Sequence, residues 1–357
     1  MSTREDEARR RRMRAARLKK MRKKRIRRTI ALLAVMVVLI AGAGVFVLVK
    51  DGNPFSGMFA GSEKMFSASE VFSGKELTGT SGKAEGFASD LCVVEGDTPL
   101  ESVSLEEGQQ GLLLDLNDHK VLFSSGAYDR VYPASITKII TALLAFKYGN
   151  MDDVVTITEE NVTLEAGSQV IGFQTGDQVT MDELVHGLLV YSGNDAASAI
   201  ATHVGGSTSK FVEMMNQYAA QLGCTGTHFT NPHGLQDENH YTTPYDIYLM
   251  LKEALKYPEF TEITQMGSYT VTFERDGVEM STPLTATDHY LTGEATPPKG
   301  ITVLGGKTGT TSSAGNCLAL LSQDAYGEPY VSIVMGASTK ELLYQQMSSL
   351  LENAAAA

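Results

Sequence analysis

The stretch "VYPASITKIITALLAF", residues 131–146, begins like a turn and continues as a wholly apolar helix. Pro133 favours a helix N-terminus, because its ring fits the first turn and not the interior. Residues three apart share one helix face, so Ser135 Oγ is expected within reach of the Lys138 amine. Burial against the apolar helix is expected to lower the pKa of this lysine, which would make it a general base for the serine.

A single Ser-x-x-Lys match carries little weight, because "STSK" at 207–210 has the same spacing. That second copy follows two glycines and is typical of an N-cap on a solvated helix. Two further motifs distinguish the first copy. They are the only Ser-x-Asn of the chain, Ser192 to Asn194, between two helical patterns, and the only Lys-Thr-Gly, 307–309, at the end of an apolar strand.

Each of these two motifs alone has a simpler explanation, a helix cap for the first and a glycine-rich turn for the second. In their order along the chain, however, the three motifs resemble the signature of the penicillin-recognising serine hydrolases. The resemblance covers about residues 108–352 and is closest to the D-alanyl-D-alanine carboxypeptidases, the low-molecular-mass penicillin-binding proteins. It rests on the phrases "PASITK", "YSGNDAA", "NPHGLQDENHYTT" and "GGKTGTT".

The resemblance implies catalytic roles for four of these residues. Ser135 would attack the carbonyl between two D-alanines, and neutral Lys138 would take its proton. Ser192 would pass that proton to the leaving amine, and Asn194 would orient Lys138 and the substrate amide.

The third motif is expected to bind the substrate. Lys307 would discourage protonation of the catalytic amine and attract the substrate's carboxylate, and Thr308 would add a hydroxyl contact. Gly309 would let the peptide lie along the strand. Similarity to the family predicts that the backbone N–H groups of Ser135 and Thr310 form the oxyanion hole.

The order of secondary-structure patterns predicts an α+β fold, with strands at both ends and helices between. Helical patterns cover residues 135–148, 181–191, 194–204, 208–222, 244–256 and 340–352. Strand patterns cover a hairpin within 110–126, short strands at 155–157 and 169–171, and a late meander of 269–273, 301–309, 317–323 and 330–338. The resemblance implies an antiparallel sheet flanked by helices, a helical subdomain beside it, and the site in the groove between.

Charge is very unevenly distributed along the chain. Residues 1–28 hold 15 of the 30 Lys and Arg, and residues 29–49 form a run of 21 residues without a charge. That length suits a helix crossing ~30 Å of hydrocarbon, and the basic block is expected to stay cytoplasmic. A nucleic-acid-binding tail is the alternative for the basic block, but the acidic remainder of the chain argues against it.

The predicted organisation therefore has five parts. They are a basic cytoplasmic tail (1–28), a transmembrane signal anchor (29–49), a Gly/Ser-rich extracellular spacer (50–107), a serine D,D-peptidase domain (108–352) and a short tail (353–357). The protein is expected at the cell membrane, as a single-pass protein with its catalytic domain outside. The odd count of three cysteines permits at most one disulfide, and whether Cys224 pairs with Cys317 is left open.

The histidines of "HFTNPHGLQDENH" invite a metal-site interpretation, involving His228, His233 and His240. Their spacing matches no strong zinc pattern, so neither a metal nor another cofactor is predicted. The family phrase makes His233 a secondary substrate-binding candidate.

The predicted function is a membrane-anchored carboxypeptidase that removes the terminal D-Ala of peptidoglycan stem pentapeptides through an acyl-enzyme. Its expected partners are that stem peptide, β-lactam antibiotics as inhibitors, and the membrane, but no nucleic acid. A β-lactamase is a less favoured alternative, because residues 214–237 contain no Glu to activate water and Gly193 stands where Ser-Asp-Asn has Asp. A slow-deacylating penicillin sensor or binding module is the third possibility.

Overall fold

The computed structural model of the chain describes residues 90–356. The predicted basic tail, the predicted membrane anchor and most of the predicted spacer lie outside the described residues. Within 90–356, no helix has the length and apolar character needed to cross a membrane.

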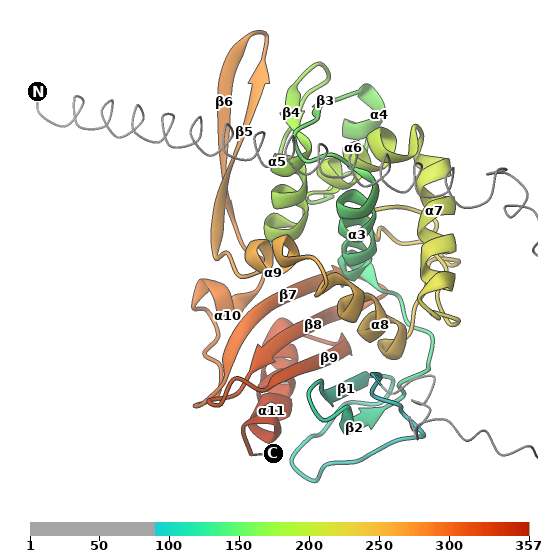
Figure 1. Ribbon diagram of the computed structural model, residues 1–357, viewed down its shortest axis with the longest axis vertical. Coiled ribbons are helices and arrows are strands. Elements are labelled where there is room, and N and C mark those ends of the chain that lie inside the picture. The colour runs from blue at the N-terminus through green and yellow to red at the C-terminus, as the bar shows by residue number, and fades with distance from the viewer. Residues whose placement is uncertain (1–89, 357) are drawn as a thin grey trace, which may run out of the picture. The chain divides into compact units, whose positions relative to one another are not determined.

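Five antiparallel strands form the main sheet, in the order β2-β1-β9-β8-β7. They are β1 (Gln110–Asp115), β2 (Lys120–Ser125), β7 (Thr302–Thr311), β8 (Gly315–Gln323) and β9 (Pro329–Ala337). Strands from the two ends of the domain lie side by side, because β1 pairs with β9 (Figure 1). The predicted first hairpin is confirmed as β1 and β2.

The eleven helical segments of the described residues include the predicted ones, with shifted ends. They are η1 (Ala134–Thr137), α3 (Lys138–Tyr148), α4 (Glu159–Val162), α5 (Met181–His186), η2 (Gly187–Tyr191), α6 (Asn194–Gly205), α7 (Thr208–Gln221), α8 (Pro244–Ala254), α9 (Pro258–Thr264), α10 (His289–Thr292) and α11 (Lys340–Ala356). The predicted helix at 181–191 is an α-helix, α5, that continues as a π-helical turn, η2. The short helices α4, α9 and α10 are not predicted by the periodicity.

Alternating side chains of the main sheet face two different layers of helices, as the twofold repeat of a strand requires. On β1, Leu113 belongs to the apolar cluster that contains Leu350 of α11, whereas Leu112 and Leu114 belong to the cluster that contains Ile247 of α8. The sheet therefore lies between α11 on one face and α8 and α9 on the other, and α3, α5, α6 and α7 gather beside it (Figure 1). The predicted α+β fold with an antiparallel sheet flanked by helices is confirmed.

The expectation that the strand at 269–273 belongs to the late meander is wrong. It forms β5 (Ser268–Arg275) and pairs with β6 (Val278–Thr285) in a second sheet, whose order β3-β4-β5-β6 also includes β3 (Val154–Thr156) and β4 (Gln178–Thr180). The cause is the two-residue turn between them, where Asp276 and Gly277 both have positive φ, 52° and 77°. An Asp-Gly pair is a strong hairpin signal, and here it pairs β5 with β6, while β4 borders β5 on its other edge.

The predicted strand at 169–171 is also wrong, since this segment has no strand conformation. Its backbone bonds to a side chain instead of to a neighbouring strand. The amides of Ile171 and Gly172 donate to the Asp195 carboxylate at 3.0 and 2.9 Å. An acidic side chain thus fixes this loop at the start of α6.

Part of the region assigned to the spacer packs on the domain. Cys92 and Val94 are buried in the main core, and Thr98 forms an antiparallel bridge with Ser124 of β2. Tyr245 Oη donates to the Cys92 carbonyl at 3.0 Å. The three cysteines are all free and buried, so Cys224 is not bonded to Cys317.

Candidate active site

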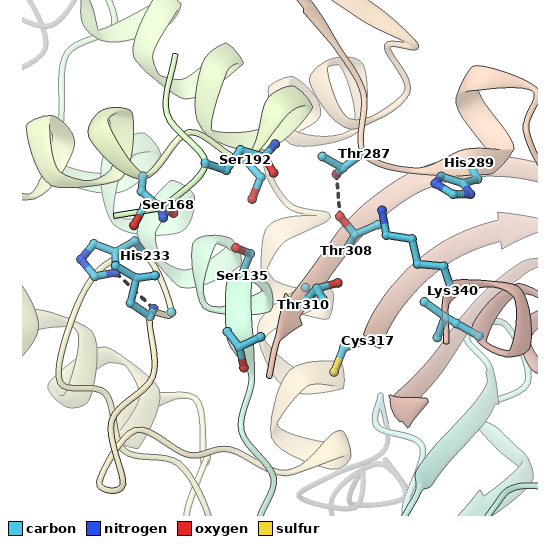
Figure 2. A pocket seen from close by; sticks show the side chains of 18 of the residues that line it. Ser135, Ser168, Ser192, His233, Thr287, His289, Thr308, Thr310, Cys317 and Lys340 are labelled. Carbon is cyan, nitrogen blue, oxygen red and sulfur yellow. Dashed lines mark hydrogen bonds between the residues drawn. The ribbon is translucent and has the colours of Figure 1, made fainter. Parts of the chain in front are cut away.

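Ser135 lies in the 3-10 turn η1, immediately before α3, so the regular helix begins at Lys138 and not at the serine. The turn still places the two side chains together, with Lys138 Nζ 2.8 Å from Ser135 Oγ. Figure 2 shows Ser135 between His233 on one side of the groove and Thr308 on the other.

Lys138 is fully buried and has three oxygen partners. Its Nζ lies 2.8 Å from Ser135 Oγ, 2.7 Å from Asn194 Oδ1 and 2.8 Å from the His233 carbonyl. Burial lowers its pKa well below the usual value, the charge of Lys307 lowers the pKa further, and Asp195 opposes both. A neutral amine has two protons and one lone pair, so its protons go to the amide and carbonyl oxygens, which are pure acceptors. The lone pair then faces Ser135, as a general base requires.

Ser192 connects η2 to α6 in a left-handed conformation, with φ 69° and ψ 34°. Lys307 Nζ, on β7, donates to Ser192 Oγ at 2.9 Å and to the Thr308 carbonyl at 3.0 Å. Burial lowers the pKa of Lys307 to about 7, against the opposing effect of Asp288. A π-turn followed by a strained serine is an arrangement that recurs at functional sites, where tertiary contacts maintain it.

Gly309 allows β7 to approach the turn that carries Ser135. A Cβ added there would lie 2.9 Å from the Pro133 carbonyl and 3.0 Å from Ser135 N. Beside it, Thr308 Oγ1 bonds to Thr287 Oγ1 and Thr310 Oγ1 bonds to Asn316 Oδ1 at 3.2 Å. β7 is an edge strand of the main sheet, so an extended peptide can pair with its free edge as a further strand.

The groove at this site encloses about 280 Å³. Seven of the nine residues predicted for the site line it: Ser135, Ser192, Asn194, His233, Thr308, Gly309 and Thr310. The other two, Lys138 and Lys307, are buried behind the residues that line the groove and hydrogen-bond to Ser135 and Ser192 respectively. The structure thus brings together all nine from segments up to about 170 residues apart in the chain.

His233 contributes through its backbone rather than its ring. Its carbonyl accepts from Lys138, whereas its Nδ1 accepts from the Leu235 amide at 3.2 Å. Burial lowers the pKa of His233 to about 3, so the ring is neutral. Within residues 90–356, no group of His, Cys, Asp or Glu side chains is arranged to hold a metal ion.

Several groove residues were not predicted. His289, Lys340 and Tyr344 also line the groove, and the centroids of the stacked His289 and Tyr344 rings lie 4.7 Å apart. Figure 2 shows His289 and Lys340 beyond Thr308 as seen from Ser135. No sequence signal marks them, because they lie in two segments about 50 residues apart and neither segment contains one of the three motifs. Asp195, which fixes the 169–172 loop at the rim, had a signal, since it follows Asn194 within the quoted "YSGNDAA".

Comparisons with known proteins identify the family of the chain. The family described as Peptidase_S11, D-alanyl-D-alanine carboxypeptidase, matches residues 101–339. The D-alanyl-D-alanine carboxypeptidase DacF of Bacillus subtilis is 34% identical over 251 residues, covering 69% of this chain and 61% of that protein. DacC of Escherichia coli is 33% identical over 253 residues, covering 67% and 59%. The chain thus spans about 60% of the length of these curated relatives.

Solved structures share the fold. A D-alanyl-D-alanine carboxypeptidase of Mycobacterium tuberculosis superposes with a TM-score of 0.62 at 28% identity, covering 72% of this chain and 93% of that one. The DD-transpeptidase of Streptomyces K15 superposes with a TM-score of 0.64 at 25% identity, covering 69% and 96%.

Proposed function

The chain belongs to the D-alanyl-D-alanine carboxypeptidase family, and we propose that it removes the terminal D-alanine from peptidoglycan stem pentapeptides through an acyl-enzyme on Ser135. The observation that carries this proposal is the pair of buried lysines, each bonded to a different serine of one groove. Lys138 contacts Ser135, and Lys307 contacts Ser192.

In the acylation step, Ser135 Oγ attacks the carbonyl carbon of the penultimate D-alanine. Its proton moves to the lone pair of Lys138 Nζ. Ser192 gives its own hydroxyl proton to the peptide nitrogen and regains one from Lys138, so that Lys138 is neutral again before the second step. The C–N bond then breaks, D-alanine leaves as the free amine, and an ester to Ser135 remains. Water attacks this ester, with Lys138 again as the base, and regenerates the serine.

The substrate would be held by β7 and the start of η1. Lys307 and Thr308 would bind the terminal carboxylate, since a partly charged ammonium beside a hydroxyl suits an anion. The N–H groups of Ser135 and Thr310 would stabilise the oxyanion. β-Lactams present a carboxylate and a reactive amide together, so they would acylate the same serine as inhibitors.

We also propose that the protein is anchored in the cell membrane through residues 29–49. The 21 uncharged residues and the 15 basic residues before them support a single span with a cytoplasmic N-terminus and an extracellular enzyme. Expression in a Gram-positive host, followed by protease treatment of intact protoplasts, tests this. The catalytic domain should be degraded from outside. A domain that stays protected until lysis contradicts the proposed orientation.

The activity is tested by incubating the purified chain with a pentapeptide ending in D-Ala-D-Ala and measuring free D-alanine. Steady release is expected, together with stoichiometric penicillin labelling, and Ser135→Ala should abolish both. Ser207→Ala is the matched control, because it alters the second Ser-x-x-Lys, where Ser207 Oγ accepts from the Lys210 amide at the start of α7. It should leave D-alanine release unchanged.

Two other outcomes would replace the proposal. Rapid penicillin hydrolysis without D-alanine release would indicate a β-lactamase. Stable labelling of Ser135 without turnover of either substrate would indicate a penicillin sensor.

A further inference from the structure

The residue before the nucleophile has a strained backbone. Ala134 has φ 45°, in the left-handed region that a residue with a Cβ rarely adopts, and its side chain is buried. Such conformations persist only where surrounding contacts maintain them. The contacts around Ala134 therefore help to set the backbone position of Ser135.

The Ala134 carbonyl is held by a buried side chain. Thr137 Oγ1 donates to this oxygen at 2.8 Å, and Thr137 is 1% exposed. Gly234 presses on the same carbonyl from the opposite loop, where an added Cβ would lie only 1.8 Å from the oxygen. The oxygen is thus fixed by a hydrogen bond and by close packing.

Thr137 is in turn held by His240, which is 2% exposed. His240 Nδ1 accepts from the Thr230 amide at 3.0 Å, so Nδ1 carries no proton. Burial lowers the pKa of His240 to about 4, and a neutral ring then has its proton on Nε2. Nε2 lies 2.8 Å from Thr137 Oγ1 and donates to it, which leaves the hydroxyl proton of Thr137 for Ala134.

The direction of these bonds matters because the Ala134 carbonyl and the Ser135 N–H belong to one peptide unit. That unit is trans and planar, so its C=O and N–H point in opposite directions. Fixing the carbonyl toward Thr137 therefore aims the N–H away from Thr137. Gly309 of β7 approaches this peptide closely, since a Cβ built there would lie 3.0 Å from Ser135 N.

We propose that His240 and Thr137 are positioning residues, which hold the Ala134–Ser135 peptide so that its N–H serves as an oxyanion donor in the groove. The inference rests on the proposed acyl-transfer function and extends it to a pair of residues outside the groove. Neither residue lines the groove and neither hydrogen-bonds to the Lys138 amine, so the hydrogen-bonded chain from His240 reaches the site through the Ala134 carbonyl.

Thr137→Val removes the hydroxyl while keeping the shape of the side chain. We expect kcat for the pentapeptide, and the penicillin acylation rate constant, to fall about tenfold to hundredfold, less than the 10²–10³ that loss of a whole oxyanion donor costs. KM should change less than about twofold, because the donor acts mainly on the transition state. Thr137→Ser should restore kcat to within about threefold of the unaltered chain.

His240 is tested in the same way. His240→Leu should lower kcat about as much as Thr137→Val, and the double variant should be no worse than either one, because both act through one hydrogen-bonded chain. His240→Gln keeps an N–H that can reach Thr137 and should retain more activity than His240→Leu.

Thr141→Val is the matched control for lost stability. Thr141 is fully buried in α3, one turn after Thr137, and donates to the Pro232 carbonyl at 2.6 Å. Pro232 lies in the loop that also carries Gly234, but Thr141 does not bond to Ala134. It should lower Tm about as much as Thr137→Val and leave kcat within about threefold.

Two results would overturn the inference. One is unaltered kcat in Thr137→Val, and the other is an equal loss of kcat in Thr137→Val and Thr141→Val. Failure of the proposed function looks different, since the unaltered chain would then release no D-alanine and take up no penicillin at Ser135.

Discussion

Lys307 lowers the pKa of Lys138, although each lysine bonds to a different serine. Two ammonium groups buried behind the same groove repel each other, and burial disfavours the charged form of both. The site is thus most favourable with one charge, and Lys307, with a pKa of about 7, carries it more readily than Lys138. This difference suits the roles proposed for the two amines, Lys138 as a neutral base and Lys307 as a cation for the carboxylate.

Substrate binding should weaken as pH rises through the pKa of Lys307. Above about pH 7 this amine loses its proton and its attraction for the terminal carboxylate. We expect KM for the free-acid peptide to rise about tenfold between pH 6 and 9. In Lys307→Arg the rise should disappear, because a guanidinium remains charged.

The same pH series with a peptide amide is the control, since that substrate has no terminal carboxylate. Its KM should be independent of pH. A flat KM profile for the free acid in the unaltered chain contradicts a carboxylate-binding role for Lys307.

Gly309→Ala should impair acylation severely at modest cost in stability. The new Cβ would lie 2.9 Å from the Pro133 carbonyl and 3.0 Å from Ser135 N, so either β7 or the nucleophile turn must shift. A misplacement of the reacting groups by about 1 Å can cost about a hundredfold in rate. The penicillin acylation rate of the variant measures this loss.

Gly96→Ala is the comparison for Gly309→Ala, because nothing lies within 4 Å of a Cβ at that position. It should acylate at the normal rate. If Gly309→Ala did so too, the close approach of β7 to Ser135 would have no catalytic consequence.

Most of the site was predictable because its residues lie in three short, rare motifs. Ser135 and Lys138 are linked by local helical geometry, which periodicity describes well. The roles of His233 and His240 were not predictable, because they depend on which atom of each histidine contacts η1 or α3. His233 uses its carbonyl, and the ring of His240 bonds to Thr137.

The fold errors have a similar origin. Alternating apolar residues identified 269–273 as a strand, but pairing is decided by turns, and the Asp276-Gly277 turn closes a hairpin outside the main sheet. The 169–171 segment resembled a strand because Val170 and Ile171 are β-branched apolar residues. Its amides, however, bond to Asp195, a long-range contact that a local pattern does not contain.

Helix α11 should contribute strongly to stability, because it packs on one face of the main sheet against β9, β8, β1 and β2. Leu350→Ala removes a fully buried side chain from the apolar cluster between α11 and the sheet, and should lower the free energy of unfolding by about 2–5 kcal/mol. Gln345→Ala, on the exposed face of the same helix, should change it by less than about 0.5 kcal/mol. Urea denaturation measures both, and equal effects would contradict the burial of Leu350.

The ion pair between Arg275 and Asp177 should make stability depend on pH. It ties the β5–β6 hairpin to β4: Nε and Nη2 donate to the two carboxylate oxygens at 2.7 Å each, and the Asp177 side chain is 1% exposed. Burial tends to raise the pKa of Asp177, but Arg275 and the Gln174 amide outweigh burial and hold the pKa below its usual value. A carboxyl with a lowered folded-state pKa stabilises above its unfolded pKa and loses that contribution as pH falls.

Arg275→Met should therefore lower Tm clearly at pH 7, and the difference from the unaltered chain should shrink as pH falls from about 5 toward 3. Lys256→Met is the control, because its partner Glu253 lies three residues away and Lys256 is largely exposed. An exposed pair of this kind contributes little, so its Tm should match the unaltered chain at pH 7. A Tm difference for Arg275→Met that stayed constant with pH would mean that lost packing of the arginine, and not the charge of Asp177, is responsible.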